Sequence, residues 1–382
     1  MNIPEEYAKF PSHWRVLPFT EAVKDVTAGN TKIPKGSYLE DGSIPIVDQG
    51  QSLFGGYIND NSAVCKSELP TIIFGDHTRV FKYIEKPFAI GADGAKVLEP
   101  LVSLDKRFLF HYLNQLKIES AGYSRHYKFL KETYVPVPPL AEQKRIAAIL
   151  DKADAICRKR QQAIDLADEF LRAVFLNMFG DPVMNPKNFP VGTIRDFVET
   201  ANYGSSAKAS EVDGEYSILR MGNITYSGAI DMSDLKYIDL SEKDKPKYLV
   251  TKGDLLFNRT NSKELVGKTA VYDGDNPVAI AGYLIRVRTN DKGNTHYISG
   301  YLNSAHGKVT LQNMCKSIVG MANINAQEMQ DIPILIPPVN LQNKYRDIVL
   351  SVKEKLTKHQ TALTFNSDLF GSLSQKAFSG NL

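Results

Sequence analysis

The sequence contains few cysteines and no long apolar run, and each absence excludes a class of protein. Among 382 residues, Cys65, Cys157 and Cys315 lie too far apart to form a Cys-x-x-Cys metal site or a disulfide framework. A reducing cytoplasm is therefore the expected compartment. No run of about 18 apolar residues could span a bilayer, and the first residues lack the basic and apolar regions of a secretion signal. We expect no association with a membrane.

Catalytic motifs are also missing. An adenine methyltransferase would need an N-P-P-Y-like or D-P-P-Y-like motif and a glycine-rich cofactor loop, but the chain offers only Pro-Pro-Leu at 138 and Pro-Pro-Val at 337. Its seven histidines form no His-Glu-x-x-His pattern. Gly267-Lys268-Thr269 resembles the end of a phosphate-binding loop, yet Ser262 stands where that loop needs its first glycine. We expect a non-catalytic chain that binds no cofactor or metal itself.

The chain repeats itself. Sliding the sequence by 199 positions superimposes Pro138, Pro139, Gln143, Ile149 and Phe179 on Pro337, Pro338, Gln342, Ile348 and Phe378 without a gap. The preceding regions also correspond, with 72–74 matching 255–257 and 112–114 matching 301–303. The sequence is therefore a tandem duplication of a unit of roughly 190 residues.

Each repeat begins with strands and ends with one helix, which predicts an α+β fold. Short runs rich in Val, Ile, Phe and Tyr, such as 44–47 and 71–74, are separated by Gly, Asn and Asp turns. Residues 140–179 contain no Pro or Gly and predict a helix of about 60 Å. The expected segments are a β-rich domain at 1–137, a helix at 138–181, a second β-rich domain at 182–336 and a second helix at 337–382.

A heptad pattern predicts that the two helices pack on each other as a coiled coil. The expected seam of the first helix consists of Ile146, Ala153, Arg160, Ala167 and Val174 in one row and Ile149, Ile156, Ala163, Phe170 and Asn177 in the other. In the second helix it includes Tyr345, Ile348, Val352, His359, Asn366 and Leu373. The polar Arg160 and His359 interrupt equivalent positions, where they would fix register. The alternative is that each helix packs on its own domain.

The linker sets the direction of the second helix. Residues 180–190 can extend about 35 to 40 Å, which is too short to run back along a helix of about 60 Å. The second helix is therefore expected to run antiparallel to the first. Two similar domains would then be related by an approximate two-fold axis within one chain.

Three segments carry a resemblance to a known family: PVPPLAEQKRIAAILDKADAICRKRQQAIDLADEFLRAVFLNMFGDP, its copy IPPVNLQNKYRDIVLSVKEKLTKHQTALTFNSDLFGSLSQKAFSGNL, and PSHWRVLPF at the start of the chain. They resemble the specificity subunit of type I restriction-modification enzymes, and the resemblance covers essentially all of the chain. The second copy departs from the pattern, because Val339-Asn340-Leu341 replaces Leu140-Ala141-Glu142.

The resemblance implies a function without catalysis. The two domains would be target recognition domains that each read one half of a split double-stranded DNA site. Two modification (methyltransferase) subunits and separate restriction/translocase subunits would be the protein partners. S-adenosylmethionine, ATP and Mg²⁺ would be bound by those partners.

Polar loops at matching positions of the two domains are the candidate DNA-binding sites. In the first domain they contain His77, Thr78 and Arg79, and then Ser124, Arg125, His126, Tyr127 and Lys128. In the second they contain Arg259, Thr260, Asn261, Ser262 and Lys263, and then Asn323 and Asn325, with Arg220 and Asn223 as a further candidate pair. These side chains suit hydrogen bonds to base edges and phosphates. Trp14 and Phe19 are expected to be core residues.

Other interpretations also fit a duplicated chain. Each loop could simply be a solvated turn. Separately, the chain could be a non-catalytic duplicated scaffold or adaptor that binds a protein or a carbohydrate. That interpretation predicts binding with little salt dependence, whereas DNA affinity falls steeply with salt. The net charge of +3 does not decide between them, because a balanced chain can gather its basic residues on one face. A single-chain restriction-modification enzyme would need a longer chain and methyltransferase motifs.

Overall fold

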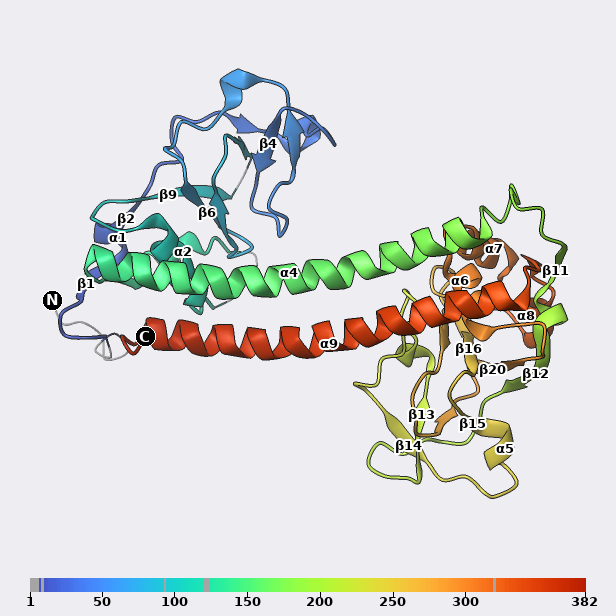
Figure 1. The fold of residues 1–382 in the computed structure, drawn as a ribbon. Coiled ribbons are helices and arrows are strands. Elements are labelled where there is room, and N and C mark those ends of the chain that lie inside the picture. Colours follow the sequence, from blue (N-terminus) through green and yellow to red (C-terminus); the bar gives the residue numbers. More distant parts are fainter. Residues whose placement is uncertain (1–6, 8–9, 93, 120–121, 123, 319–320) are drawn as a thin grey trace. The chain divides into compact units, whose positions relative to one another are not determined.

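The computed structural model of the chain describes residues 7, 10–92, 94–119, 122, 124–318 and 321–382 (Figure 1). The chain divides into two compact units. Unit 1 comprises Met1–Arg160 and Ala362–Leu382, and unit 2 comprises Gln161–Thr361. Each unit therefore contains one globular part and portions of both long helices.

Unit 1 is built on two sheets. The first has the antiparallel order β2 (Val23–Asp25), β9 (Ala95–Pro100), β6 (Thr71–Gly75) and β7 (Phe81–Ile84). The second has the order β3 (Lys32–Ile33), β8 (Ala89–Gly91), β4 (Ile44–Val47) and β5 (Gly56–Ile58), with β8 parallel to both neighbours. In addition, β1 (Arg15–Pro18) pairs with β10 (Tyr134–Val137). The helices are α1 (Phe19–Ala22), α2 (Lys106–Gln115) and α3 (Tyr127–Leu130), with 3-10 turns η2 (Lys35–Ser37) and η3 (Asn61–Ala63).

Unit 2 has the corresponding sheets. The first has the antiparallel order β12 (Val198–Tyr203), β20 (Leu284–Thr289), β16 (Leu255–Asn258) and β18 (Thr269–Val271). The second has the order β14 (Lys236–Ile238), β13 (Tyr216–Leu219), β19 (Val278–Ile280) and β15 (Leu249–Val250). Two smaller sheets are β11 (Val191–Thr193) with β23 (Pro333–Leu335), and β17 (Thr260–Asn261) with β22 (Met321–Asn323) and β21 (Lys316–Ile318). The helices are α5 (Lys245–Tyr248), α6 (Thr295–Asn303), α7 (Ala305–Met314) and α8 (Ala326–Gln330), with 3-10 turns η4 (Ile194–Phe197) and η5 (Met221–Asn223).

The shared topology confirms the predicted α+β fold and internal duplication. The order β2-β9-β6-β7 corresponds to β12-β20-β16-β18, and the parallel pair β4/β8 corresponds to β13/β19. The units differ at one sheet edge, where β3 runs parallel to β8 but β15 runs antiparallel to β19. Within the described residues, the sheet β17-β22-β21 has no counterpart in unit 1.

The two predicted long helices begin directly after the proline pairs. Helix α4 spans Leu140–Phe179, and α9 spans Val339–Ala377. A buried glutamine fixes the start of α4. Gln143 Oε1 accepts the Asp105 N–H at 2.7 Å, while Nε2 donates to the carbonyls of Ser103 and Pro138 at 3.0 and 2.8 Å.

The second repeat keeps this glutamine contact. Gln342 Oε1 accepts the Asn294 N–H at 2.9 Å, and Nε2 donates to the carbonyls of Lys292 and Pro337 at 3.0 and 2.8 Å. Asn294 is also the N-cap of α6, as Asp105 is of α2. The glutamine of the motif therefore joins the long helix to the cap of a short helix in each globular part.

The helices run antiparallel, as predicted. Ile146 near the start of α4 shares the core of unit 1 with Phe378, directly after the end of α9. In unit 2, Phe175 near the end of α4 lies 5.5 Å, between ring centroids, from Tyr345 near the start of α9. Each unit thus combines the beginning of one helix with the end of the other.

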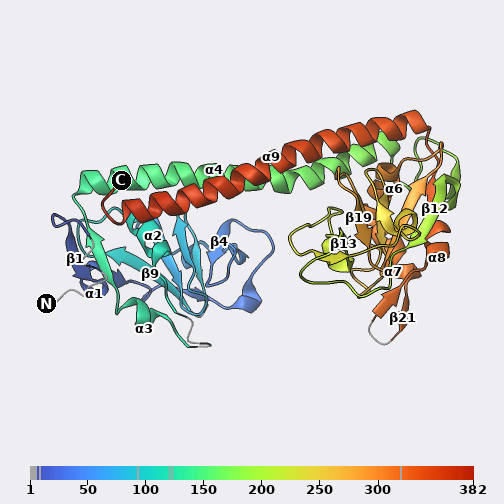
Figure 2. The same cartoon turned by 90° about the horizontal axis from the view of Figure 1, so that it is seen from below.

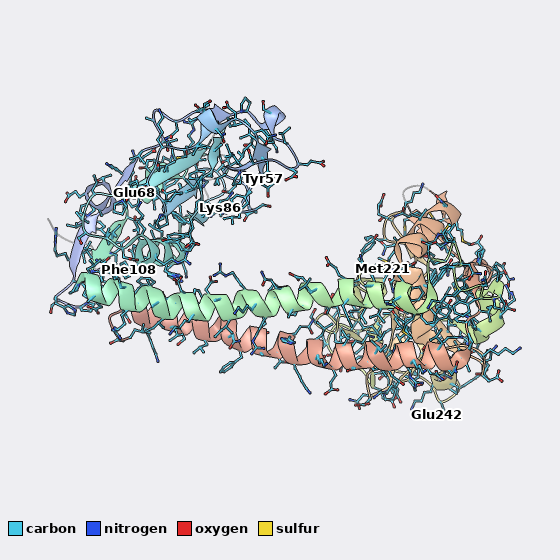
Figure 3. All side chains as sticks on the ribbon, turned by 45° about the horizontal axis from the view of Figure 1, so that its top comes forward. Tyr57, Glu68, Lys86, Phe108, Met221 and Glu242 are labelled. Atoms are coloured by element: carbon cyan, nitrogen blue, oxygen red, sulfur yellow. The ribbon has the colours of Figure 1, made fainter. Side chains whose placement is uncertain are left out.

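One buried cluster of unit 1 lies between the sheet β2-β9-β6-β7 and the long helices. Phe108 of α2 faces this side, with its ring 5.6 Å from that of Phe378, while Tyr57 lies farther from α4 (Figure 3). Trp14 and Phe19 are buried in the same core, as predicted. None of the helices within the described part of the chain is long and apolar enough to cross a membrane.

The buried rows of the long helices differ by one residue from the predicted register. Ile146, Ala153, Arg160, Ala167 and Val174 are buried or partly buried as expected, and so are Tyr345, Val352, His359, Asn366 and Leu373. In the second row, however, Ile156 and Phe170 are about half exposed and Asn177 is exposed. The covered residues are instead Leu150, Cys157, Ile164, Leu171 and Met178 in α4, and Val349, Leu356, Leu363, Phe370 and Ala377 in α9.

The reason for this difference is that a heptad core allows steps of three or four residues. Apolar residues occupy adjacent positions at 149–150 and 170–171, so the sequence fits both registers. Ile149, Ala163 and Ile348 remain partly buried beside the covered row. In the structure, the covered residue lies four positions after each residue of the first row, as Leu150 lies after Ile146.

Candidate nucleic-acid interface

In unit 1, the two predicted reading loops lie against each other. The Asp76 carboxylate accepts the Tyr127 backbone N–H at 2.7 Å, and the Asp76 carbonyl accepts the His126 N–H at 2.9 Å. Asp76 is buried, and its charge strengthens the bond. Segments 51 positions apart in the chain therefore form one surface. It includes α3, which lies on the side of this globular part opposite the long helices (Figure 2).

Two residues predicted to bind DNA support this surface from within. His126 is buried, and its Nδ1 donates to the Asp76 carbonyl at 2.9 Å. Tyr127 packs against Phe74, and burial raises the pKa of its phenol to about 12. The His126 ring is covered by the loops that it connects, so in this structure it supports the surface rather than forming part of it.

A third loop joins this surface, and it was missed in the sequence. Thr78 donates its hydroxyl to the Gln49 carbonyl, and the His77 N–H donates to the Gln49 side chain at 3.2 Å. Lys82 reaches the preceding carbonyl, that of Asp48, at 2.7 Å. Burial lowers the pKa of Lys82, although the Asp48 carboxylate opposes this shift. The repeat alignment could have identified this loop, because residues 46–47 match 218–219 and Asp48 then aligns with the candidate residue Arg220.

The exposed predicted side chains in unit 1 are basic. Arg79, Arg125 and Lys128 are exposed, whereas Ser124 is partly buried and has a partner in the protein. Arg79 adopts a positive φ of 63°, and its Nη1 donates to the Ile118 carbonyl at 2.9 Å. Three cations thus project from adjoining loops, an arrangement suited to phosphates and base edges.

In unit 2, the corresponding loops are joined by a β-ladder. Thr260 of β17 pairs with Asn323 of β22, and the Asn323 amide also donates to the Thr260 hydroxyl at 2.8 Å. The Ile324 N–H donates to the Arg259 carbonyl at 2.9 Å. Strand β21 lies on the side of this globular part opposite the long helices (Figure 2). The same pair of loops therefore meets in both repeats.

Three predicted residues of unit 2 have structural partners. Asn325 caps α8 by accepting the Glu328 N–H at 2.9 Å. Asn223 is buried, and its amide donates to the Asp234 carbonyl at 2.8 Å. Arg220 forms an ion pair with the Asp234 carboxylate at 2.9 Å. The Asn223 side chain is therefore enclosed in this structure, and the Asn325 side chain is engaged in its capping bond.

The remaining candidates follow Arg259 in the sequence, and the Arg259 guanidinium lies over an aromatic ring. The Arg259 guanidinium lies 4.7 Å from the ring centroid of Tyr203 at the end of β12. Asn261 accepts the Ser262 N–H at 2.9 Å, and Lys263 is exposed. Tyr203 was missed in the sequence, where its only signal is an aromatic residue at the end of a strand.

The segment resembling a phosphate-binding loop has another role. Lys268 is buried, and its Nζ donates to the Met221 carbonyl at 3.0 Å. Burial lowers the pKa of this amine. Lys268 therefore supports the loop after β13, much as Lys82 supports the loop after β4. The described residues include no group of three His, Cys, Asp or Glu side chains that could hold a metal ion.

Each unit also exposes an apolar pair on a long helix. In unit 2, Leu166 and Phe170 of α4 are 60% and 52% exposed. In unit 1, Phe365 and Leu369 of α9 are 67% and 44% exposed. The shift of 199 positions relates the two pairs. Adjacent exposed apolar side chains can form a patch of the kind that marks a protein-docking surface.

Comparisons with known proteins agree with these features. A family model described as a type I restriction modification DNA specificity domain matches residues 19–166 and 186–363. The chain is 27% identical over 270 residues to the type I restriction enzyme EcoKI specificity subunit of Escherichia coli K12, covering 65% of this chain and 57% of that protein. It is 26% identical over 273 residues to the StySPI specificity subunit of Salmonella potsdam, with the same shares. The chain spans about half the length of the curated relatives it matches.

One solved structure extends over the whole chain. It is the S subunit of a type I restriction-modification system from M. genitalium, with a TM-score of 0.64 and 15% identity, covering 99% of this chain and 98% of that one. At this identity, the similarity shows the fold.

Proposed function

Since the chain belongs to the type I restriction-modification DNA specificity family, we propose that it is the sequence-reading subunit of such a complex. Each globular part, 1–137 and 182–336, reads one half of a split site in double-stranded DNA. The helix segments 138–181 and 337–382 carry the partner subunits. The chain itself performs no catalysis.

The observation that carries this proposal is the pairing of the same two loops in both repeats. Loops that follow β6 and β16 meet loops that precede β10 and β23. The scaffold is duplicated, but the side chains on the loops differ. One unit carries the exposed Arg79, Arg125 and Lys128, and the other carries the partly buried Arg259 and Asn261 with the exposed Lys263. Because base recognition depends on side-chain chemistry, the two half-sites should differ in sequence.

The repeated apolar pairs support two docking sites for modification subunits. Leu166 and Phe170 would contact one copy, and Phe365 and Leu369 would contact the other. These subunits, together with the restriction/translocase subunits, would bind S-adenosylmethionine, ATP and Mg²⁺.

The test is reconstitution with modification subunits of the same system, followed by methylation of a random DNA library and sequencing of the modified sites. We expect adenine methylation at one split, asymmetric sequence, and only when this chain is present. Native mass measurement should find two modification subunits per chain. Methylation without sequence preference, or methyl transfer by this chain alone, would contradict the proposal.

A further inference from the structure

Arg259 differs from the other arginines of the second globular part. That part, residues 182–336, has four others. Arg195, Arg220 and Arg288 pair with the carboxylates of Asp331, Asp234 and Asp254, and Arg286 donates to the carbonyls of Pro246 and Leu249. Arg259 has no hydrogen-bond or ion-pair partner for its side chain among the described residues. An arginine without an acidic partner on this surface has donors available for a ligand from outside the chain.

The fold holds this arginine in place. Its N–H donates to the Tyr283 carbonyl at 3.0 Å, and its carbonyl accepts the Ile324 N–H at 2.9 Å. The guanidinium stacks on Tyr203, and the Tyr203 hydroxyl accepts the Ala326 N–H at 3.0 Å, which ties the ring to the start of α8. Stacking favours one orientation of the planar group before any ligand binds.

The Nε atom of Arg259 is covered and has no partner within the described residues. The two terminal nitrogens are therefore the donors that remain for a ligand. Two parallel N–H groups at the end of a guanidinium match the O6 and N7 acceptors of guanine, whereas adenine presents an acceptor beside a donor there. A phosphate would need only charge, and the neighbouring exposed Lys263 can supply that contact.

We propose that Arg259 reads a guanine in the half-site bound by unit 2 and that Tyr203 is the positioning residue for its guanidinium. This inference rests on the proposed function, because it assumes that unit 2 binds DNA. It specifies one base of the split site and assigns the recognition of that base to one side chain.

The experiment uses the complete complex with its modification subunits and the random-library methylation assay. In the wild-type complex, one position of the unit 2 half-site should require guanine. Arg259→Lys keeps the charge but loses the planar fork, so the preference for guanine at that position should fall by about 10-fold to 100-fold. The other half-site should stay unchanged.

Tyr203 is tested with two substitutions. Tyr203→Phe keeps the ring and should retain the guanine preference, whereas Tyr203→Leu should weaken it as Arg259→Lys does. Arg195→Lys, in a surface ion pair of the same unit, is the matched control and should leave the site unchanged. If Tyr203→Leu fails to fold, Arg259→Lys still decides the assignment of the base.

The outcomes separate the two levels of the argument. A wild-type complex that methylates without a split site contradicts the proposed function. A split site whose guanine preference survives Arg259→Lys overturns this inference and leaves the proposed function intact. Equal loss of methylation at every sequence would assign Arg259 to a phosphate and would also overturn it.

Discussion

Substitution of Gln342, the buried glutamine at the start of α9, tests whether its hydrogen bonds attach the long helix to the second globular part. Replacing Gln342 by alanine removes the partners of the Asn294 N–H and of the Lys292 and Pro337 carbonyls. A buried polar group left unsatisfied costs about 1 to 3 kcal/mol. Water can enter the vacated space and satisfy part of this set. We therefore expect the free energy of unfolding to fall by about 3 kcal/mol.

The measurement is urea-induced unfolding of the full chain, followed by far-ultraviolet circular dichroism. Gln375→Ala is the matched control, because Gln375 lies exposed on the same helix. Gln143→Ala makes the equivalent change in unit 1, where the single tryptophan, Trp14, is a fluorescent reporter of that core. If Gln342→Ala unfolds at the same urea concentration as Gln375→Ala, the three hydrogen bonds do not stabilise the helix start.

Three further predictions follow from contacts within single units. Arg125→Ala should weaken discrimination in the unit 1 half-site by about 1 to 3 kcal/mol, measured by competition between specific and random DNA; equal weakening of both would reassign Arg125 to a phosphate. Phe170→Asp should reduce the number of bound modification subunits from two to one, and combining it with Phe365→Asp should leave none, as native mass measurement would show; two copies bound to the double variant would contradict these docking sites. Burial lowers the pKa of His111 below its ordinary 6.5 despite its bond to Asp151. Its neutral form therefore stabilises the fold above that pH, and stability falls as pH drops from about 7 to about 5; His111→Asn should flatten this slope in thermal unfolding, and an unchanged slope would refute the assignment.

Much of the fold could be predicted because its signals are local or repeated. Residues 140–179 lack proline and glycine and follow a proline pair, so both helix ends agree with the prediction. The buried strands β4 and β6 appear as short apolar runs between turns. The second seam row was placed wrongly because adjacent apolar residues satisfy either heptad step, and only packing decides between them.

The candidate site was less predictable because a polar side chain in a loop looks the same whether it faces solvent or a buried partner. His126 bonds to Asp76, 50 positions earlier, and no local sequence pattern predicts a contact between residues so far apart in the chain. Asn325 could have been recognised as a helix N-cap, since Glu328 follows at the spacing of a capping box. Tyr203 lies on a strand far from Arg259 in sequence, and only the sheet brings them together.

The two repeats preserve their supporting contacts while changing the way in which the reading loops are built. The glutamine contacts at Gln143 and Gln342 involve the same three kinds of backbone groups. The loops, by contrast, are joined by the Asp76 carboxylate in unit 1 and by the β17–β22 ladder in unit 2. Because the supporting contacts at Gln143 and Gln342 involve neither Arg125 nor Arg259, side chains on the candidate loops can change without weakening the helix attachments. Under the proposed function, we therefore expect such a duplicated scaffold to accommodate two unrelated half-sites, and a change in one loop should alter one half of the target alone.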